Sequence, residues 1–188
     1  MWYPHTVTVA AASEPVTVTQ AKAQCRVDGT DSDTEITALI AAARSYVESY
    51  CGRVLITRTI TAKCDSFADF AQFPIVPLAS VTSVSYVDGA GATQTLSTDV
   101  YEVRTDGLTA SLALKSGQSW PSIQSGSRIT VTAVVGASAA PEAVMHAMLL
   151  LIADWYDQRG NTVLGTNQPT EMPHAVTALL ANYRAFSF

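Results

Sequence analysis

The residue types that most often carry chemistry are sparse and scattered in this chain. Its three histidines, His5, His146 and His174, are far apart, and none has a second metal-ligating side chain at helical spacing. We therefore expect His146 at a helix surface or interface and no metal site. No glycine-rich phosphate loop, GxSxG elbow or HExxH motif is present. We expect no cofactor.

The strongest hint of catalysis is a pair of carboxylates, Asp154 and Asp157, followed by Arg159 near the end of a predicted helix. Two carboxylates can serve a hydrolase as general acid and base, but such pairs on one helix are common. Arg159 there complements the helix dipole, and we expect the aspartates to be solvated. A small hydrolase remains the alternative from the enzyme class, and the preferred interpretation is a protein without catalytic residues.

Two further groups of residues could hold a metal or form a disulfide. The acidic cluster Asp28, Asp31, Asp33 and Glu35 lacks the glycine and terminal glutamate of an EF-hand loop, and a turn followed by a helix start accounts for it better. The three cysteines are odd in number and lack CxxC spacing. This pattern favours reduced thiols in a protein made in the cytosol.

Composition restricts the classes of partner. The chain has 188 residues, of which 48% are hydrophobic and only 14% charged, a balance that raises the expectation of subunit interfaces. A net charge of −5 argues against sequence-independent DNA binding, which needs a basic face. The most hydrophobic stretch, Val144 to Ile152, is too short to cross a bilayer, and no secretory signal opens the chain.

One long helix over residues 32–52 organises the predicted fold. Ser32 followed by Glu35 fits a capping box, and Gly52 suits the left-handed position that ends a helix. One apolar stripe recurs at steps of three and four residues: Ile36, Leu39, Ile40, Ala43, Val47 and Tyr50. A second stripe of small residues, Ala38, Ala41, Ala42, Ser45 and Ser49, would let another helix approach closely. The pattern indicates two packed faces.

The rest of the chain predicts an α+β fold: a small helical bundle with an inserted antiparallel β-sandwich or barrel-like region. Residues 1–15 are expected to form an extended arm. Thr19 is expected to cap a short helix over 19–26, and a second long helix is predicted over 141–160, with Pro141 in its first position. Short strands separated by turn residues span 54–135. A loop and a short helix from Pro173 occupy 161–188.

The order of several short motifs resembles a known family. Residues 20–28, Gln-Ala-Lys-Ala-Gln-Cys-Arg-Val-Asp, lead through an acidic turn into the long helix, which ends with Glu48, Gly52 and Arg53. A Pro-Leu-x-Ser-Val-x-Ser-Val-x-Tyr-x-Asp run starts at Pro77, and Trp120-Pro121 follows. The late helix carries Leu150-Leu151, Trp155-Tyr156 and Arg159. Over residues 16–160 this arrangement is similar to the head–tail connector proteins of long-tailed bacteriophages and prophages, also called head-completion or adaptor proteins.

The resemblance implies a structural virion protein. Such proteins form a ring, usually of twelve subunits, beneath the portal of the filled capsid, and they give a platform for the next neck or tail component. The implied partners are further copies of the chain, the portal protein, the next connector, and genomic DNA that passes through the lumen without sequence-specific binding. The implied location is the head–tail junction of the virion, after synthesis in the host cytoplasm. The family supplies no catalytic residues to carry over. Another phage neck or tail ring protein, a stopper or a tail terminator, is the alternative within the structural class.

The C-terminal segment is the predicted docking element. Family members often reach the portal through this end, and the segment carries apolar residues on a helix too short to be stable alone. We expect it to be loosely held and to order on docking, and the alternative is that these residues fold back onto the core of their own subunit. The expected portal contacts are Leu179, Leu180, Tyr183, Phe186 and Phe188.

Overall fold

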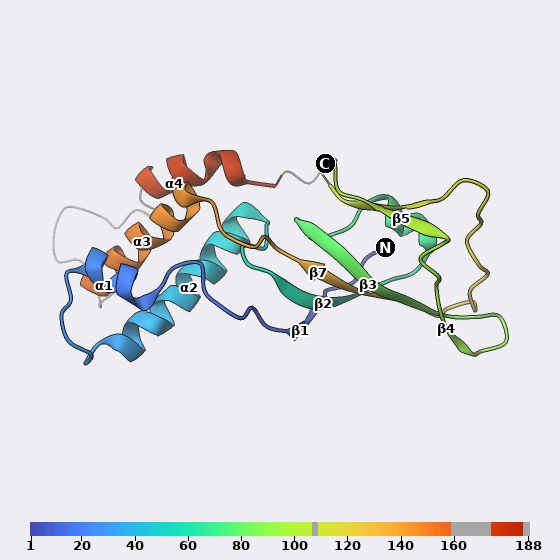
Figure 1. Cartoon of the computed structure of the whole chain (residues 1–188), viewed down its shortest axis with the longest axis horizontal. Coiled ribbons are helices and arrows are strands. Elements are labelled where there is room, and N and C mark those ends of the chain that lie inside the picture. Colours follow the sequence, from blue (N-terminus) through green and yellow to red (C-terminus); the bar gives the residue numbers. More distant parts are fainter. Residues whose placement is uncertain (107–108, 159–173, 186–188) are drawn as a thin grey trace. The chain divides into compact units, whose positions relative to one another are not determined.

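The computed structural model of the chain describes residues 1–106, 109–158 and 174–185 and divides into two compact units (Figure 1). The β unit comprises Met1–Ala12 and Ile56–Ser138, and the helical unit comprises Ser13–Leu55 and Ala139–Phe188. The described α-helices belong to the helical unit, and both antiparallel sheets belong to the β unit. The predicted α+β class is therefore confirmed.

The described part of the helical unit is built around its third helix. The elements are α1 (Val18–Cys25), α2 (Asp33–Cys51), α3 (Glu142–Asp157), α4 (His174–Leu180) and the 3₁₀ turn η2 (Ala181–Tyr183). Helix α3 packs against α1, α2 and α4. Val47 of α2 and Leu151 of α3 are both buried, in agreement with the predicted pairing of the two long helices. None of the helices in the described residues is long and apolar enough to cross a membrane.

The helix starts differ from the predicted ones. The predicted cap at Thr19 is wrong, because α1 begins at Val18 and Thr17 is its N-cap. The Thr17 hydroxyl accepts a hydrogen bond from Gln20 N (3.2 Å), and the Gln20 side chain accepts one from Thr17 N (2.9 Å). Of the two threonines, Thr17 alone has a glutamine three residues later, as a capping box requires.

The capping box predicted at Ser32 is also wrong. Ser32 makes no side-chain cap bond, and its Oγ lies 3.1 Å from the hydroxyl of Tyr156 on α3. At the other end, Gly52 takes the predicted left-handed conformation with φ of 62°. Pro141 is the N-cap of α3 rather than its first helical residue, and its carbonyl accepts from Val144 N and Met145 N. Helix α3 ends at Asp157, and residues 159–160, the predicted end, lie outside the described residues.

The β unit contains a five-stranded antiparallel sheet of order β1-β2-β7-β3-β4 and a separate two-stranded sheet. The strands of the larger sheet are β1 (Thr6–Val9), β2 (Arg58–Cys64), β3 (Leu78–Val87), β4 (Thr93–Thr95) and β7 (Ile129–Val135). The smaller sheet pairs β5 (Tyr101–Arg104) with β6 (Ser111–Leu114). Part of the predicted N-terminal arm is thus an edge strand, since β1 pairs with β2.

The middle strand β7 carries the core of the larger sheet. Its predicted inward residues Ile129, Val131, Ala133 and Val135 are all buried, and they alternate with half-buried neighbours. Gly136 follows with φ of 96°, and a Cβ there would lie 2.4 Å from the carbonyl oxygen of Ile56. No larger residue fits this close approach without a backbone shift.

The predicted turn between β3 and β4 is present and is held by one carboxylate. Asp88 accepts hydrogen bonds from the N–H groups of Ala90 and Ala92 and from the side chain of Gln94, at 2.9, 3.0 and 2.9 Å. These bonds, that from Gln94 foremost, lower the pKa of Asp88.

Candidate interaction surfaces

The side chains considered for catalysis do not converge in the described residues. Residues 1–106, 109–158 and 174–185 contain no group of three His, Cys, Asp or Glu side chains that could hold a metal ion. His146 is exposed on α3, as predicted. Asp154 accepts a hydrogen bond from the Gln158 side chain at 3.0 Å, which is an ordinary contact at a helix end. Arg159 lies outside the described residues.

The three thiols are free, and two of them are buried. Burial raises the pKa of Cys64 to about 12, and burial likewise raises the pKa of Cys51 and Cys25. The thiolate is the reactive form of cysteine, so these shifts make the buried thiols poor nucleophiles at neutral pH.

The β unit contains a cluster of aromatic rings drawn from distant parts of the chain. The 3₁₀ helix η1 (Phe67–Ala71) supplies Phe67 and Phe70. Trp120 stacks on Phe67 with ring centroids 4.8 Å apart, and it meets Phe70 edge-on at 5.5 Å. Trp2 stacks on Phe70 at 6.0 Å and donates its indole N–H to the carbonyls of Asp69 and Gln72. Such offset and edge-to-face contacts hold the rings in fixed positions.

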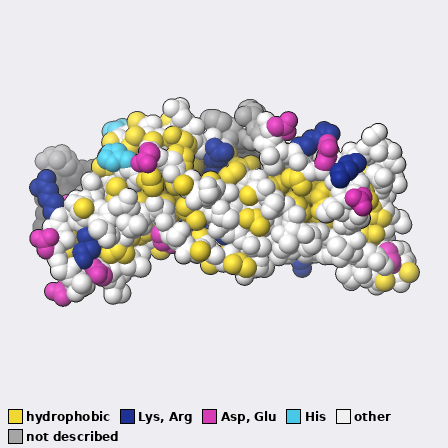
Figure 2. Space-filling model, in the orientation of Figure 1, with side chains coloured by type: hydrophobic (Ala, Val, Ile, Leu, Met, Phe, Trp, Pro, Cys, Tyr) yellow, Lys and Arg dark blue, Asp and Glu magenta, His cyan; other side chains and the backbone are white. Residues whose placement is uncertain are grey.

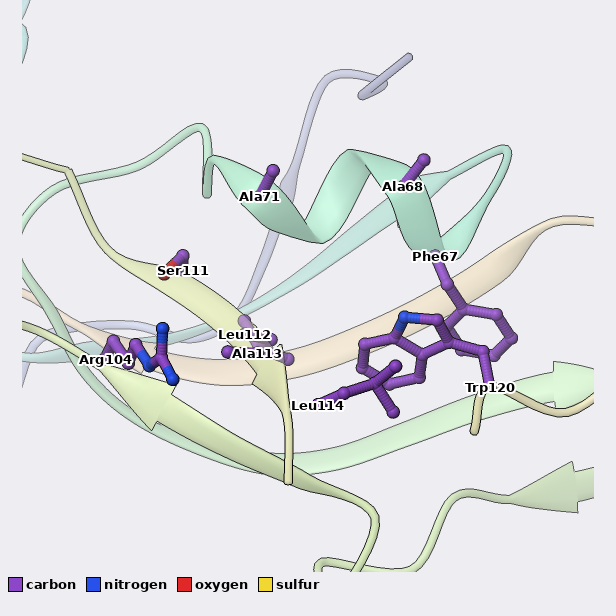
Figure 3. A pocket seen from close by; sticks show the side chains of 9 residues that line it. All are labelled: Phe67, Ala68, Ala71, Arg104, Ser111, Leu112, Ala113, Leu114 and Trp120. Carbon is purple, nitrogen blue, oxygen red and sulfur yellow. The ribbon is translucent and has the colours of Figure 1, made fainter. Parts of the chain in front are cut away.

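One side of this cluster borders an open groove of about 360 Å³ between η1 and β6 (Figure 3). Ala68 and Ala71 of η1 line one wall, and residues 111–114 of β6 line the other. Phe67 and Trp120 lie at one end, and Arg104 lies at the other. The side chains that line the walls are therefore small or apolar, and the end formed by Trp120 is a flat aromatic surface. We call this hollow the β6 groove.

The second surface is the outer face of α2. Its residues Ile36, Ile40, Ala43, Val47 and Cys51 are buried, whereas Ala38, Ala42, Ser45 and Ser49 are exposed. The stripe of small residues predicted to receive a helix is thus open in the single chain. Tyr46 beside it is 37% exposed and meets Trp155 of α3 edge-on at 5.8 Å. From residue 38 to residue 49 every exposed residue of α2 is uncharged, whereas the solvent face of an amphipathic helix normally carries charged residues. In the space-filling view, yellow hydrophobic side chains reach the surface among charged ones (Figure 2).

The predicted docking residues are divided by burial. Leu180 is fully buried, as is Val176, because α4 packs against α3 of its own unit. Leu179 and Tyr183 are half-buried, and Phe186 and Phe188 lie outside the described residues. After η2 the chain stays attached to α2, since Ala185 N donates to Cys51 O at 2.6 Å and the Arg184 guanidinium lies over the Tyr50 ring. Where the structure describes it, the C-terminal segment is therefore held on its own unit.

Sequence reasoning did not find the β6 groove. The available signals were the three phenylalanines in residues 65–73 and the Trp120-Pro121 pair. No periodicity links a 3₁₀ turn to a loop tryptophan some fifty positions later, so only the folded chain shows that they meet.

Comparisons with known proteins bear on these surfaces. A family model described as "Head completion protein" matches residues 14–186. A comparison with curated proteins finds no match. Among solved structures, a chain of the "Neck of empty GTA particle computed with C6 symmetry" has a TM-score of 0.80 at 21% identity and covers 99% of this chain and 97% of that chain. A chain of the "Virion of native gene transfer agent (GTA) particle" gives a TM-score of 0.79 at 21% identity, with the same coverage. A chain of the "Neck of native GTA particle computed with C12 symmetry" gives 0.69 at 23% identity, covering 96% of this chain and 97% of that one.

Proposed function

The chain belongs to the head completion protein family, and from this membership we propose that it forms a ring at the neck of a tailed phage or phage-like particle. The single observation that carries the proposal is the family match over residues 14–186. The similarity in fold to chains of gene transfer agent necks, which extends over nearly the whole chain, supports the proposal. The family is one of structural components, so the chain is not an enzyme.

We propose a ring of twelve subunits that lies between the portal and the next neck or tail component. Two of the similar structures are necks computed with twelvefold and sixfold symmetry, and a twelve-membered ring is compatible with both. A ring needs two different contact faces on each subunit, because head-to-tail contacts close only when face and counter-face differ. The exposed small-residue stripe of α2 is one surface suited to such packing.

Charge supports a ring through which DNA can pass. Residues 13–55 and 139–188 contain ten acidic and six basic side chains, whereas residues 1–12 and 56–138 contain six and five. Binding of duplex DNA by its phosphates requires clustered lysine and arginine. A ring of acidic subunits would not retain the genome, so we propose passage without sequence-specific binding.

Docking on the portal is proposed for the C-terminal segment, with the set Leu179, Leu180, Tyr183, Phe186 and Phe188. Within this set, the buried Leu180 would hold α4 on α3, and the half-buried Leu179 and Tyr183 would contact the portal. Because Leu179 and Tyr183 are only half-buried, they can be replaced without removing the buried contact of Leu180 with α3. The double variant Leu179→Ser and Tyr183→Ser should keep the thermal transition of the parent and lose attachment to portal-bearing capsids.

The decisive experiment is electron microscopy of portal-bearing capsids with and without the purified protein. The expected result is a closed ring of this chain on the portal, and free protein that is smaller by light scattering. The control for the Leu179→Ser and Tyr183→Ser variant is Thr177→Ser on α4, which should attach to the capsids normally. A stable two-fold dimer both in solution and on capsids would contradict the proposal.

A further inference from the structure

The outer edge of β6 has backbone groups without a hydrogen-bond partner in the described residues, on the half-buried Leu114 and on Leu112, which is 3% exposed. Lys115 N donates to the carbonyl of Val100, the residue before β5, and the pair register then places the hydrogen bonds of Ser111 and Ala113 toward β5 as well. The N–H and C=O groups of Leu112 and Leu114 therefore point to the opposite edge. Within the described residues no hydrogen bond uses them, although Ala110 O on the same edge accepts from Phe73 N.

The β6 groove runs along this edge and is shaped for an extended chain. The wall opposite β6 is formed by η1, where the lining residues Ala68 and Ala71 have small side chains. Leu114 and Trp120 are half-buried and offer apolar surface to an incoming side chain. Unpaired strand-edge groups with adjacent apolar surface are what strand addition requires, because backbone bonds supply affinity and side-chain contacts supply selectivity.

The same unit carries an edge strand that could fill such a groove. Strand β1 is exposed along its whole length, and Val7 and Val9 are 43% and 59% exposed. These valines are two of the four large hydrophobic residues exposed in the described part of the chain. Edge strands of soluble proteins are commonly protected by charges or proline, yet Thr6–Val9 contains neither. An unprotected edge of this kind is suited to pairing with another chain.

We propose that β1 of one copy adds to the outer edge of β6 in a second copy, with Val7 and Val9 packed against the β6 groove. The added strand β1 and the β6 edge that receives it are different surfaces of the same unit. The contact is therefore heterologous and can propagate from subunit to subunit until a ring closes. This inference rests on the proposed ring and names one of its contacts.

Disulfide trapping tests the contact in assembled particles. In a Cys25→Ser background, which removes the half-exposed native thiol, the variant Val9→Cys/Ala71→Cys places one thiol on the donor strand and one on the groove wall. Mild oxidation of assembled particles should give a ladder of cross-linked multimers. Each single-cysteine variant should stay monomeric in denaturing gels. So should the matched control Val9→Cys/Ala90→Cys, in which Ala90 is an exposed alanine of the β3–β4 turn.

A groove-filling variant gives the second measurement. Ala71→Trp occupies the groove from an exposed position and should abolish ring formation without lowering the thermal midpoint, whereas Ala90→Trp should leave assembly unchanged. Normal rings from Ala71→Trp, or intact rings that give no Val9–Ala71 ladder, would overturn the strand-addition proposal while leaving the ring itself established. Absence of any ring of the parent chain on portal-bearing capsids would instead remove the proposed function.

Discussion

The two units differ in how far along the chain their defining contacts reach. In the helical unit the buried face of α2 recurs every three or four residues, and the cap of α1 joins residues three apart. In the β unit, Trp2 stacks on Phe70 and Phe67 stacks on Trp120. The helical unit also carries most of the negative charge, whereas the β unit is nearly neutral. Local order thus defines the single helices of the first unit, which α3 then joins from a distant part of the chain, and long-range aromatic contacts join the elements of the second.

The largest expected effect is loss of the aromatic centre of the β unit. Phe70 is fully buried and contacts the rings of Trp2, Phe67 and Trp120. Phe70→Ala should cost about 3–5 kcal/mol in free energy of unfolding, because it leaves a cavity among rings that cannot collapse into it. Urea unfolding followed by tryptophan fluorescence measures this loss, and Phe70→Leu should lose less. An unchanged urea midpoint for Phe70→Ala would show that the cluster does not hold the β unit together.

The corresponding test in the helical unit removes a side chain from the α2–α3 core. Leu151 is 1% exposed, and Leu151→Ala should cost about 2–5 kcal/mol. Adjacent alanines of α2 then distinguish its two faces. Ala43 is fully buried, so Ala43→Leu should cost about 1–3 kcal/mol by overpacking, whereas the exposed Ala42→Leu should stay within about 0.5 kcal/mol of the parent. Equal losses from the two alanine variants would place another element on the outer face of α2.

The features that the sequence predicts correctly are those set by neighbours along the chain. The α2 stripe, Gly52, the inward face of β7 and the β3–β4 turn were predicted because each depends on neighbours within a few residues. The fold class followed from their order. The sequence pattern predicts a cap at Ser32 that the structure lacks, since the Ser32 hydroxyl is instead close to that of Tyr156, 124 positions away. The β6 groove and the burial of Leu180 depend on tertiary packing, which periodicity does not report.

The buried thiol of Cys64 gives the β unit a pH dependence in a defined range, and burial raises the pKa of Cys51 in the helical unit as well. Its pKa is raised from an ordinary value of 9.0 to about 12, so the folded state holds this proton more tightly than the unfolded state. The stabilisation is complete below pH 9 and is lost as the pH rises from 9 to 12, by about 1.4 kcal/mol per pH unit. Urea midpoints of the parent and of Cys64→Ala at pH 8 and pH 10.5 isolate the effect from other titrating groups. The difference between the two proteins should shrink at the higher pH, and a constant difference would contradict the assigned pKa.

The smallest expected effect tests local order at the start of α1. Thr17→Ala removes the hydroxyl that accepts from Gln20 N and should cost about 1 kcal/mol. Thr19→Ala is the matched control, because Thr19 is exposed one residue inside the helix and lacks a glutamine or glutamate three residues later. Alanine is a better helix former than threonine, so this control should be neutral or slightly stabilising. The comparison requires only urea midpoints of two single variants. If Thr19→Ala were the costlier change, the helix would begin two residues later than the structure places it, and the capping box would not set the boundary of α1.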